Sequence, residues 1–378
     1  MGTCGEERSR KKNFILKGAK DHSNHSKIKK SKLNNSNLDL NEYSEFNVIN
    51  KTLETPLNNK KKNLVKKSIN SKIDKNINND KNKAQNSDYQ YHEVQTLKGH
   101  SDKIASLTEL DSGCIATGSY DCTIRIWDLN KNECVMIKED KGTVFCLLEF
   151  EPNMILAGTS NNNIGLWNLS SQNNEIEFNF LQHELWVTSL VKCDDDHFAS
   201  GGNDSNIFIW DYKNRKYKYS LTGHKDCVLS LINLKDGNLC SGSTDLTIKI
   251  WDWKNKTLNL DITTPHKKWI KCLCQLRDGT LLSGSEYICV WSEKDLFTPI
   301  KRLSEHKHYT RTICQVDDNH FASGSFDETI KIWNIKDFTV TQTIKAHDSN
   351  IICIIKLKNN KLVSCSNDMT IKIWDKNN

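Results

Sequence analysis

Four side-chain types that can carry chemistry recur together along this sequence: a histidine, a serine or threonine, an aspartate and a tryptophan. Ser241 lies 17 positions after His224, an aspartate follows 4 positions later, and a tryptophan 6 positions after that. Five sets share this spacing: His100, Thr117, Asp121 and Trp127; His183, Ser200, Asp204 and Trp210; His224, Ser241, Asp245 and Trp251; His306, Ser323, Asp327 and Trp333; and His347, Ser364, Asp368 and Trp374. Serine, histidine and aspartate are also the residue types of a hydrolytic triad, in which histidine takes the proton of the attacking serine.

The recurrence of these sets argues against catalysis. A catalytic triad is a single constellation beside one substrate pocket, whereas this chain repeats the spacing five times and ties each copy to a tryptophan. A buried indole N–H needs an acceptor, and a buried histidine needs a partner for each ring nitrogen, so the four side chains can satisfy one another inside a fold. We therefore predict structural tetrads, no catalytic residues, no enzymatic activity and no cofactor.

The tryptophans also give the second part of the chain a period. Seven of the ten, from Trp127 to Trp374, follow one another at intervals of 40, 43, 41, 40, 42 and 41 residues. A constant interval of about 40–45 residues is typical of propeller blades. Within one repeat, residues 225–234, 239–241 and 247–251 have strand patterns, and Asp236-Gly237 suits a hairpin turn. With a further strand before the next repeat, each unit is expected to form a four-stranded antiparallel sheet.

These spacings resemble those of the WD-repeat (Trp-Asp repeat) β-propeller family. The signature dipeptides of that family, or close versions of them, occur here as Gly99-His100, Gly223-His224, Trp127-Asp128, Trp251-Asp252 and Trp374-Asp375. The resemblance covers about residues 91–378 and implies an all-β fold, a seven-bladed β-propeller of four-stranded antiparallel blades. It also implies that each tetrad is a hydrogen-bonded chain from tryptophan through serine or threonine and histidine to aspartate. Stacking the sheets around an axis buries faces that one sheet cannot bury alone.

Two repeats depart from the pattern. The second keeps only the tryptophan, and its other three positions hold Asp140, Ala157 and Asn161. The fifth keeps His266 and Ser283 but reaches its tryptophan two residues early, without an aspartate in the turn. We expect blades two and five to be the least rigid.

The two ends of the repeat region are expected to close the ring. The last repeat ends at Asn378, which leaves no room for a fourth strand after Asp375. Residues 91–97 are a strand-like segment before the first Gly-His. In the family such a segment becomes the outer strand of the last blade, so the ring is expected to close through backbone hydrogen bonds between its ends.

The resemblance also points to candidate partner-binding residues. In the family, partners contact the end face where the His-bearing loop and the Asp-bearing turn emerge. Positions one and three after the histidine, and those beside the aspartate, usually point there. At these positions the chain has Lys103, Tyr120, Trp186, Lys225, Lys267, Trp269, Lys307, Tyr309 and Phe326. Aromatic side chains supply contact area and lysines supply charge, so we expect protein partners with acidic or phosphorylated peptides. The alternative is that some of the aromatic side chains pack between blades or at the channel mouth.

Residues 1–90 differ in composition from the rest. They hold 20 Lys and Arg, 10 Asp and Glu, and 17 Asn but no Trp, whereas residues 91–378 hold 33 basic and 37 acidic residues. The net charge of +6 therefore combines a tail of +10 with a propeller of −4. With little apolar surface to offset the entropy of ordering, we predict a disordered, Lys/Asn-rich basic tail that acts as a solvated linker. The alternatives are a nuclear-import signal or contact with nucleic acid or anionic lipid.

The first residues contain a candidate lipidation motif. Gly2 could be myristoylated after removal of Met1, and Cys4 could be palmitoylated, which would anchor the tail to a membrane. Glu6 stands where the motif has Ser or Thr, which counts against this hypothesis. The sequence has no run of about 18 apolar residues and no signal-peptide core. We therefore expect a cytoplasmic monomer within a larger complex, with nuclear or membrane-associated locations as alternatives.

Other polar clusters have simpler explanations. The 14 cysteines include no C-x-x-C pair and lie in apolar segments, as expected for reduced thiols that pack as small hydrophobic side chains. Asp194-Asp-Asp-His197 has metal-ligand residue types but stands where other repeats have a hairpin turn, so no metal site is predicted.

Three functions fit these observations. The leading one is a non-catalytic scaffold or adaptor that binds partner proteins or peptides on the propeller top face. The alternatives are a substrate-recognition subunit of a ubiquitin ligase that reads phosphorylated peptides, and a subunit of an RNA- or chromatin-associated complex that uses the basic tail.

Overall fold

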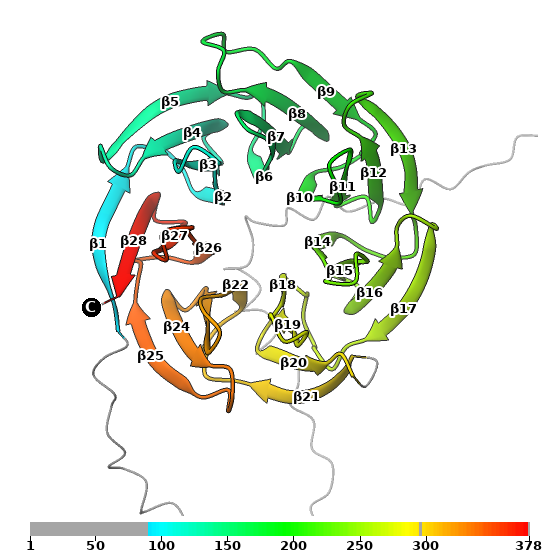
Figure 1. The fold of residues 1–378 in the computed structure, drawn as a ribbon, viewed down its shortest axis with the longest axis vertical. Coiled ribbons are helices and arrows are strands. Elements are labelled where there is room, and N and C mark those ends of the chain that lie inside the picture. Colours follow the sequence, from blue (N-terminus) through cyan, green and yellow to red (C-terminus); the bar gives the residue numbers. More distant parts are fainter. Residues whose placement is uncertain (1–89, 295–296, 377–378) are drawn as a thin grey trace, which may run out of the picture. The chain divides into compact units, whose positions relative to one another are not determined.

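The computed structural model describes residues 90–294 and 297–376, which form 28 strands in seven four-stranded antiparallel sheets. The sheets are blades around a central axis, and each blade runs from an inner strand at the axis to an outer strand at the rim (Figure 1). This confirms the predicted seven-bladed β-propeller. The tail expected over residues 1–90, with Gly2 and Cys4, lies outside the described residues except for Gln90.

The strand bounds follow the predicted repeat. Blade one is β2 (Ile104–Glu109), β3 (Ile115–Ser119), β4 (Thr123–Asp128) and β5 (Glu133–Glu139); blade two is β6 (Val144–Glu151), β7 (Met154–Thr159), β8 (Asn163–Asn168) and β9 (Phe178–Leu181). Blade three is β10 (Val187–Lys192), β11 (His197–Gly202), β12 (Ile207–Asp211) and β13 (Lys216–Leu221); blade four is β14 (Val228–Asn233), β15 (Leu239–Ser243), β16 (Thr247–Asp252) and β17 (Thr257–Thr263). Blade five is β18 (Cys272–Gln275), β19 (Leu281–Gly284), β20 (Ile288–Ser292) and β21 (Thr298–Leu303); blade six is β22 (Thr310–Gln315), β23 (His320–Ser325), β24 (Thr329–Asn334) and β25 (Val340–Lys345). Blade seven is β26 (Ile351–Lys356), β27 (Leu362–Ser366) and β28 (Thr370–Lys376), completed by β1 (Tyr91–Lys98).

The core lies between neighbouring blades. In blade four, β15 is buried at every position, β16 is buried at its four central positions, and the outer strand β17 is mostly exposed. One apolar cluster joins Cys240 and Ile248 of blade four to Leu273 and Trp291 of blade five. Because every blade buries its faces against two neighbours, the β-branched and aromatic residues of the repeat are satisfied only in the closed ring.

Tight turns set the position of the tetrad aspartates. The residue after the aspartate has a positive φ in each complete tetrad; for example, Leu246 has φ 68° and Glu328 has φ 68°. The aspartate caps its own turn: the backbone N–H of Thr247 donates to Asp245 Oδ1 over 2.9 Å. The carboxylate is thus fixed locally before it contacts any other loop.

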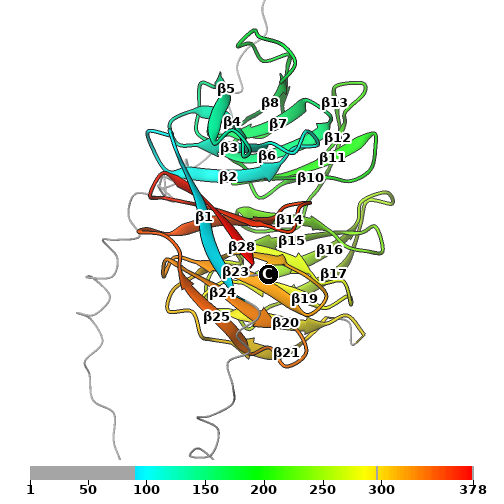
Figure 2. The same ribbon diagram turned by 60° about the vertical axis from the view of Figure 1, so that its left-hand side comes forward.

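The ring closes through its two ends, as predicted. Strand β1 pairs antiparallel with β28, from Tyr91 opposite Lys376 to Lys98 opposite Thr370, and the two strands lie side by side in Figure 2. Gln342 of β25 adds a clasp from the neighbouring blade: its side-chain oxygen accepts from Tyr91 N–H at 2.8 Å and its side-chain nitrogen donates to Tyr91 O at 2.7 Å.

The remaining polar clusters lie in hairpins. The Asp194–His197 segment connects β10 to β11, and Asp194 Oδ1 lies 2.8 Å from His197 Nδ1, so the turn interpretation is confirmed. Across residues 90–294 and 297–376, no three His, Cys, Asp or Glu side chains gather to hold a metal ion. Within the same ranges, no helix has the length and apolarity needed to cross a membrane. The 13 cysteines of this part of the chain are all free, and burial raises the pKa of Cys146 and Cys272 to about 12.

Candidate partner-binding site on the top face

Each complete tetrad is one connected hydrogen-bond chain. In blade four, Trp251 Nε1 donates to Ser241 Oγ at 2.8 Å, and the same oxygen lies 2.7 Å from His224 Nε2. His224 Nδ1 lies 2.9 Å from Asp245 Oδ2. The other four complete tetrads repeat these contacts within about 0.1 Å. The chain is satisfied when the serine hydroxyl donates to Nε2 and the histidine N–H at Nδ1 donates to the carboxylate.

The tetrads have triad distances but not triad access. All five serine or threonine side chains of the complete tetrads are 0 % exposed, and each oxygen already accepts the indole N–H. A nucleophile must reach a substrate carbonyl beside an oxyanion site, and these oxygens cannot do so. Their arrangement therefore serves to fix the fold.

The electrostatics of the tetrads favour ionised aspartates. Burial opposes ionisation of Asp121, but hydrogen bonds from Thr123, Ser101 and His100 outweigh it and lower its pKa to about 2. The pKa of Asp245 is likewise lowered, because contacts with His224, the Lys225 N–H and Thr247 outweigh the effect of burial. Burial lowers the pKa of His100, which keeps the ring neutral as the hydrogen-bond chain requires.

The aspartate also positions the residue that follows the histidine. Asp245 Oδ2 accepts the backbone N–H of Lys225 at 2.9 Å, and Asp327 Oδ2 accepts that of Lys307 at 2.8 Å. Both lysine side chains are exposed. A buried network thus holds the loop that presents lysines on one end of the ring. We call this end, formed by the tetrad histidine loops and aspartate turns, the top face.

Blade five replaces the missing aspartate with a glutamate. Glu286 Oε1 accepts the Lys267 N–H at 2.8 Å, and Glu286 Oε2 lies 3.7 Å from His266 Nδ1. Burial opposes ionisation of Glu286, but contacts with His266, Ser285 and the Lys267 N–H lower its pKa to about 2. The shortened turn therefore still fixes its loop, and the sequence pattern missed Glu286 because it lies three positions after Ser283 instead of four.

Blade two leaves its tetrad unsatisfied. Without a serine at Ala157, Trp167 Nε1 is buried with no hydrogen-bond partner among the described residues, and the same holds for Asp140 Oδ2. Burial raises the pKa of Asp140, although the N–H groups of Gly142 and Lys141 oppose the shift. That this blade is among the least rigid remains a prediction.

Over blades five and six, three of the predicted residues gather around a lysine. Lys271 Nζ lies 4.9 Å from the ring centroid of Trp269, 5.2 Å from that of Tyr309 and 5.3 Å from that of Phe326. Only 9 % of Lys271 is exposed, so its ammonium sits among rings instead of in water. Lys267 and Lys307 are exposed on the two flanking loops. We call Trp269, Lys271, Tyr309 and Phe326 the caged-lysine cluster.

Over blades one to three, the other predicted aromatic residues form a row. Lys103 Nζ lies 5.6 Å from the ring centroid of Tyr120, and the Tyr120 and Phe145 rings meet edge to face at 5.7 Å. The Phe145 and Trp186 centroids are 5.2 Å apart. The nine predicted residues thus separate into an aromatic row, the caged-lysine cluster and the exposed lysines Lys225, Lys267 and Lys307.

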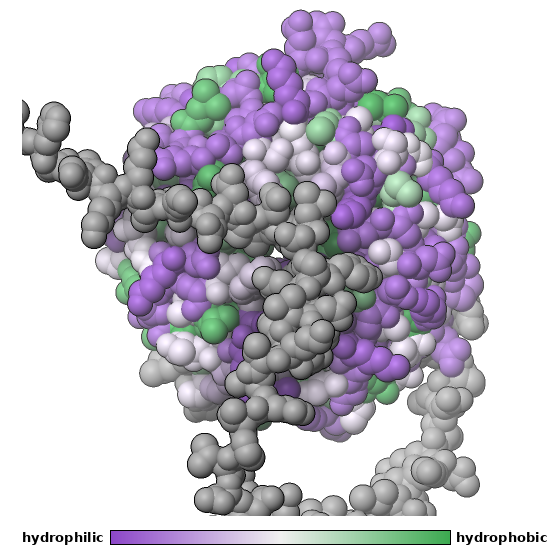
Figure 3. All heavy atoms as spheres, turned by 180° about the vertical axis from the view of Figure 1, so that it is seen from behind, coloured by the Kyte–Doolittle hydropathy of each residue, from purple (hydrophilic) through white to green (hydrophobic). Residues whose placement is uncertain are grey.

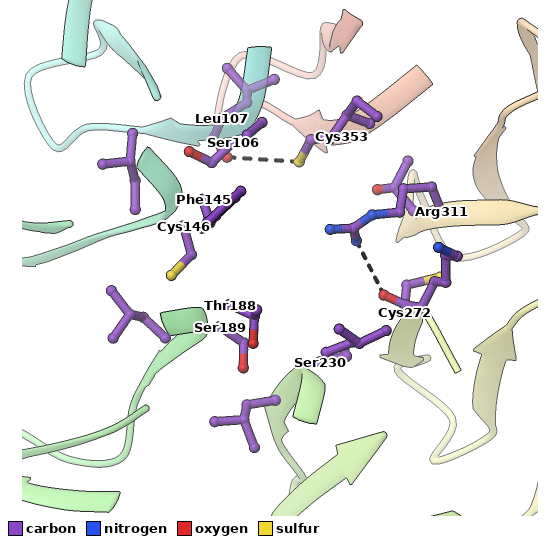
Figure 4. Close-up of a pocket in the computed structure, with 18 of the residues that line it drawn as sticks. Ser106, Leu107, Phe145, Cys146, Thr188, Ser189, Ser230, Cys272, Arg311 and Cys353 are labelled. Carbon is purple, nitrogen blue, oxygen red and sulfur yellow. Dashed lines mark hydrogen bonds between the residues drawn. The ribbon is translucent and has the colours of Figure 1, made fainter. Parts of the chain in front are cut away.

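Three residues near these groups were not predicted: Phe145, Lys271 and Arg311. All three occupy the same repeat position, five residues after the tetrad histidine or, in blade two, after Asp140. This position lies near the start of the inner strand or just before it, and all three residues line the mouth of the central channel. Figure 4 shows Phe145 and Arg311 there. Reading the chain by that offset would have found them. The end face shown in Figure 3 is hydrophilic over most of its described surface, with small separate apolar groups.

Comparisons with known proteins agree with this architecture. The family model described as "WD domain, G-beta repeat" matches residues 91–128, 175–211, 215–252, 297–334 and 338–375. The chain is 29% identical over 124 residues to "Ribosome biogenesis protein WDR12 homolog" of Culex quinquefasciatus. The aligned segment covers 32% of this chain and 29% of that protein. Proteins of the same name from Anopheles gambiae and Aedes aegypti are 29% and 30% identical over 125 and 127 residues, again 32% of this chain and 29% of theirs. The chain thus matches less than a third of these relatives' length.

Proposed function

Because this chain belongs to the WD40 repeat family, we propose that it is a non-catalytic scaffold that binds partner proteins on its top face within a multiprotein complex. The caged-lysine cluster carries the proposal. It combines three aromatic rings and an ammonium with the exposed Lys267 and Lys307 on adjacent loops. Such a combination supplies contact area and positive charge together, which is what an interface hot spot requires.

The chemistry of this face favours an acidic or phosphorylated partner segment. Lysines one position after the tetrad histidine present their ammonium groups to solvent, while their backbone N–H groups are held by tetrad carboxylates. A partner carboxylate or phosphate would pair with these cations and lie across the aromatic rings. The ubiquitin-ligase alternative uses the same surface, but the name of the relatives described above, ribosome biogenesis protein, does not support it.

The proposal is tested by capture of partners on the full chain. Replacing Trp269, Lys307 and Tyr309 together with alanine is expected to remove most captured proteins, because hot-spot aromatic and charged side chains each contribute about 2 kcal/mol or more. The control replaces the exposed Lys235, Arg277 and Lys358, which lie in or beside the turns between the first two strands of blades four, five and seven. Retention of every partner by the first variant would refute the proposal.

A second candidate function is a subunit of an RNA-associated complex. The relatives' name, ribosome biogenesis protein, and the net charge of +10 over residues 1–90 support it. In this candidate the tail contacts RNA and the propeller contacts proteins. This candidate implies a nuclear location. The comparisons give no support for the cytoplasmic location expected from the sequence.

A further inference from the structure

The mouth of the central channel contains a cavity of about 220 Å³ that all seven blades line with their inner strands or the residues just before them. Among its 20 lining residues are two cations, Lys271 and Arg311, and no Asp or Glu. The cations stand on adjacent blades, five and six, so the positive charge is concentrated on one side of the mouth. A concave site with low-dielectric walls and one sign of charge attracts ions of the opposite sign.

Arg311 is half-buried and points toward the middle of the channel (Figure 4). Its Nη1 donates to the backbone oxygen of Lys271 at 3.1 Å, which fixes the orientation of the guanidinium and uses one of its five N–H donors. This carbonyl is its hydrogen-bond partner among the described residues, and no carboxylate there forms an ion pair with it. A partly buried cation of this kind gains most from a carboxylate, which it can bind with two parallel hydrogen bonds.

The opposite side of the mouth is aromatic. Figure 4 shows Phe145 directed into the channel across from Arg311. The Phe145 ring continues into the row with Tyr120 and Trp186. A segment that crosses the mouth therefore meets a guanidinium on one side and apolar ring faces on the other.

Two buried hydroxyls provide a second, independent observation. Ser106 and Ser189 line the same cavity, are each only 8 % exposed, and have no hydrogen-bond partner among the described residues. At the equivalent position, Thr312, Cys146 and Cys353 each contact a backbone oxygen of the next blade. Buried polar groups without partners are costly, so the cavity is suited to a polar occupant.

We propose that this cavity receives an acidic side chain of a partner peptide, whose carboxylate pairs with Arg311 while an adjacent apolar side chain of the same peptide packs on Phe145 and Trp186. This inference rests on the proposed binding function of the top face and adds the chemistry of the ligand. The occupant is a partner and not the chain's own N-terminal segment, because residues 1–90 carry a net charge of +10. A net positive segment is repelled by a cationic mouth.

The ligand is unidentified, so the experiment selects it. A displayed library of random unphosphorylated dodecapeptides is panned on the full chain, and enriched peptides are measured by fluorescence anisotropy. The expected consensus pairs Asp or Glu with a neighbouring aliphatic or aromatic residue. Replacing the acidic residue of the peptide by its amide is expected to weaken binding about tenfold or more, and Arg311→Gln in the protein is expected to do the same. The two changes together are expected to weaken binding no further than either one alone. Arg311→Lys is expected to weaken binding as well, since lysine keeps the charge but cannot donate two parallel hydrogen bonds to the carboxylate.

Matched variants separate this inference from the proposed function. Arg277→Gln removes an exposed arginine at a hairpin away from the channel lining and is expected to bind as the parent chain does. If peptides lose binding to the Trp269, Lys307 and Tyr309 variant but keep it with Arg311→Gln, the top face binds and the Arg311 site is refuted. A consensus without acidic residues, or a library that yields no binder, also overturns the inference. Equal melting temperatures of Arg311→Gln and the parent chain exclude misfolding as the cause of a loss.

Discussion

At the scale of single residues, the tetrads show how the same side chains can build a triad or a scaffold. The distances from the serine or threonine oxygen to histidine and from histidine to aspartate are 2.7 Å and 2.8–2.9 Å in all five complete sets. The decisive contact is the third one, from the tryptophan N–H, because it occupies the serine or threonine oxygen inside the core. The difference between catalysis and structure therefore lies in burial and not in residue type.

The lowered pKa of Asp121 predicts how acid affects this network. The folded-state pKa, about 2, is below the ordinary value of 3.8, so the stabilisation is present above pH 3.8 and is lost as the pH falls through about 2. Asp121→Asn is expected to cost about 1.5–3 kcal/mol at pH 7, since it removes the charge from a hydrogen-bonded carboxylate. The difference from the parent chain should shrink between pH 4 and pH 2, measured by urea unfolding. Asp318→Asn, at an exposed ion pair, should change the unfolding free energy by less than about 1 kcal/mol, and a pH-independent Asp121 effect would contradict the assignment.

The unsatisfied indole of blade two gives a stabilising prediction. Ala157→Ser is expected to raise the unfolding free energy by about 0.5–1.5 kcal/mol, because the new hydroxyl can accept from Trp167 Nε1 and donate to the backbone oxygen of Gly165. In blade four, the equivalent hydroxyl of Ser241 lies within hydrogen-bond distance of the equivalent backbone oxygen, that of Lys249.

The control for this change is Ala199→Ser, one position before a tetrad serine and fully buried. It introduces a hydroxyl without an orphan donor nearby and should destabilise by about 1–3 kcal/mol. Thermal or urea unfolding of both variants gives the comparison. Equal destabilisation by the two serines would show that Trp167 gains nothing from the new oxygen.

At the scale of elements, the recurring turn and strand patterns made the blades predictable. The interval between tryptophans gave the number of blades, and the segment before the first Gly-His gave the closing strand, now seen as β1 on β28. The role of Glu286 and the set of rings around Lys271 could not be found in the same way. Glu286 works from a shortened turn, which changes its offset, and Lys271 is defined by rings from the fifth and sixth repeats that only the folded ring brings together. Regular spacing in the sequence reveals the contacts within each repeat but not the contacts between repeats.

The closing strand carries a prediction of its own. Deleting residues 91–97 is expected to lower the melting temperature by more than roughly 10 °C, since it removes the outer strand of blade seven and the Gln342 clasp on Tyr91 and leaves β28 as an open edge. Deleting residues 1–88 is expected to change it by less than about 2 °C, because this segment has too few apolar residues to form a core. Similar melting of the two truncations would refute closure by β1.

At the scale of the whole molecule, charge separates two potential activities. The propeller sequence, residues 91–378, has 33 basic and 37 acidic residues, whereas the first 90 residues have 20 and 10. The net negative charge of the propeller sequence does not favour general binding to nucleic acid, although its top face presents local cations. If the chain acts in an RNA-associated complex, the RNA contact is therefore expected in the tail and the protein contact on the propeller.

This division predicts a salt dependence that belongs to the tail. The full chain is expected to bind single-stranded RNA with an affinity that falls linearly on a log–log plot against salt, with a slope of about −0.7 per phosphate neutralised. The chain that lacks residues 1–88 should bind at least about tenfold more weakly and with a shallower slope, because 20 of the 53 lysines and arginines are then missing.

 Electrophoretic mobility shifts or fluorescence anisotropy at 50–300 mM salt would measure both chains. The top-face variant of Trp269, Lys307 and Tyr309 is the matched control and should keep the RNA affinity of the parent chain while losing protein partners. Equal RNA binding by the truncated and full chains would move the contact to the propeller and refute this division of labour.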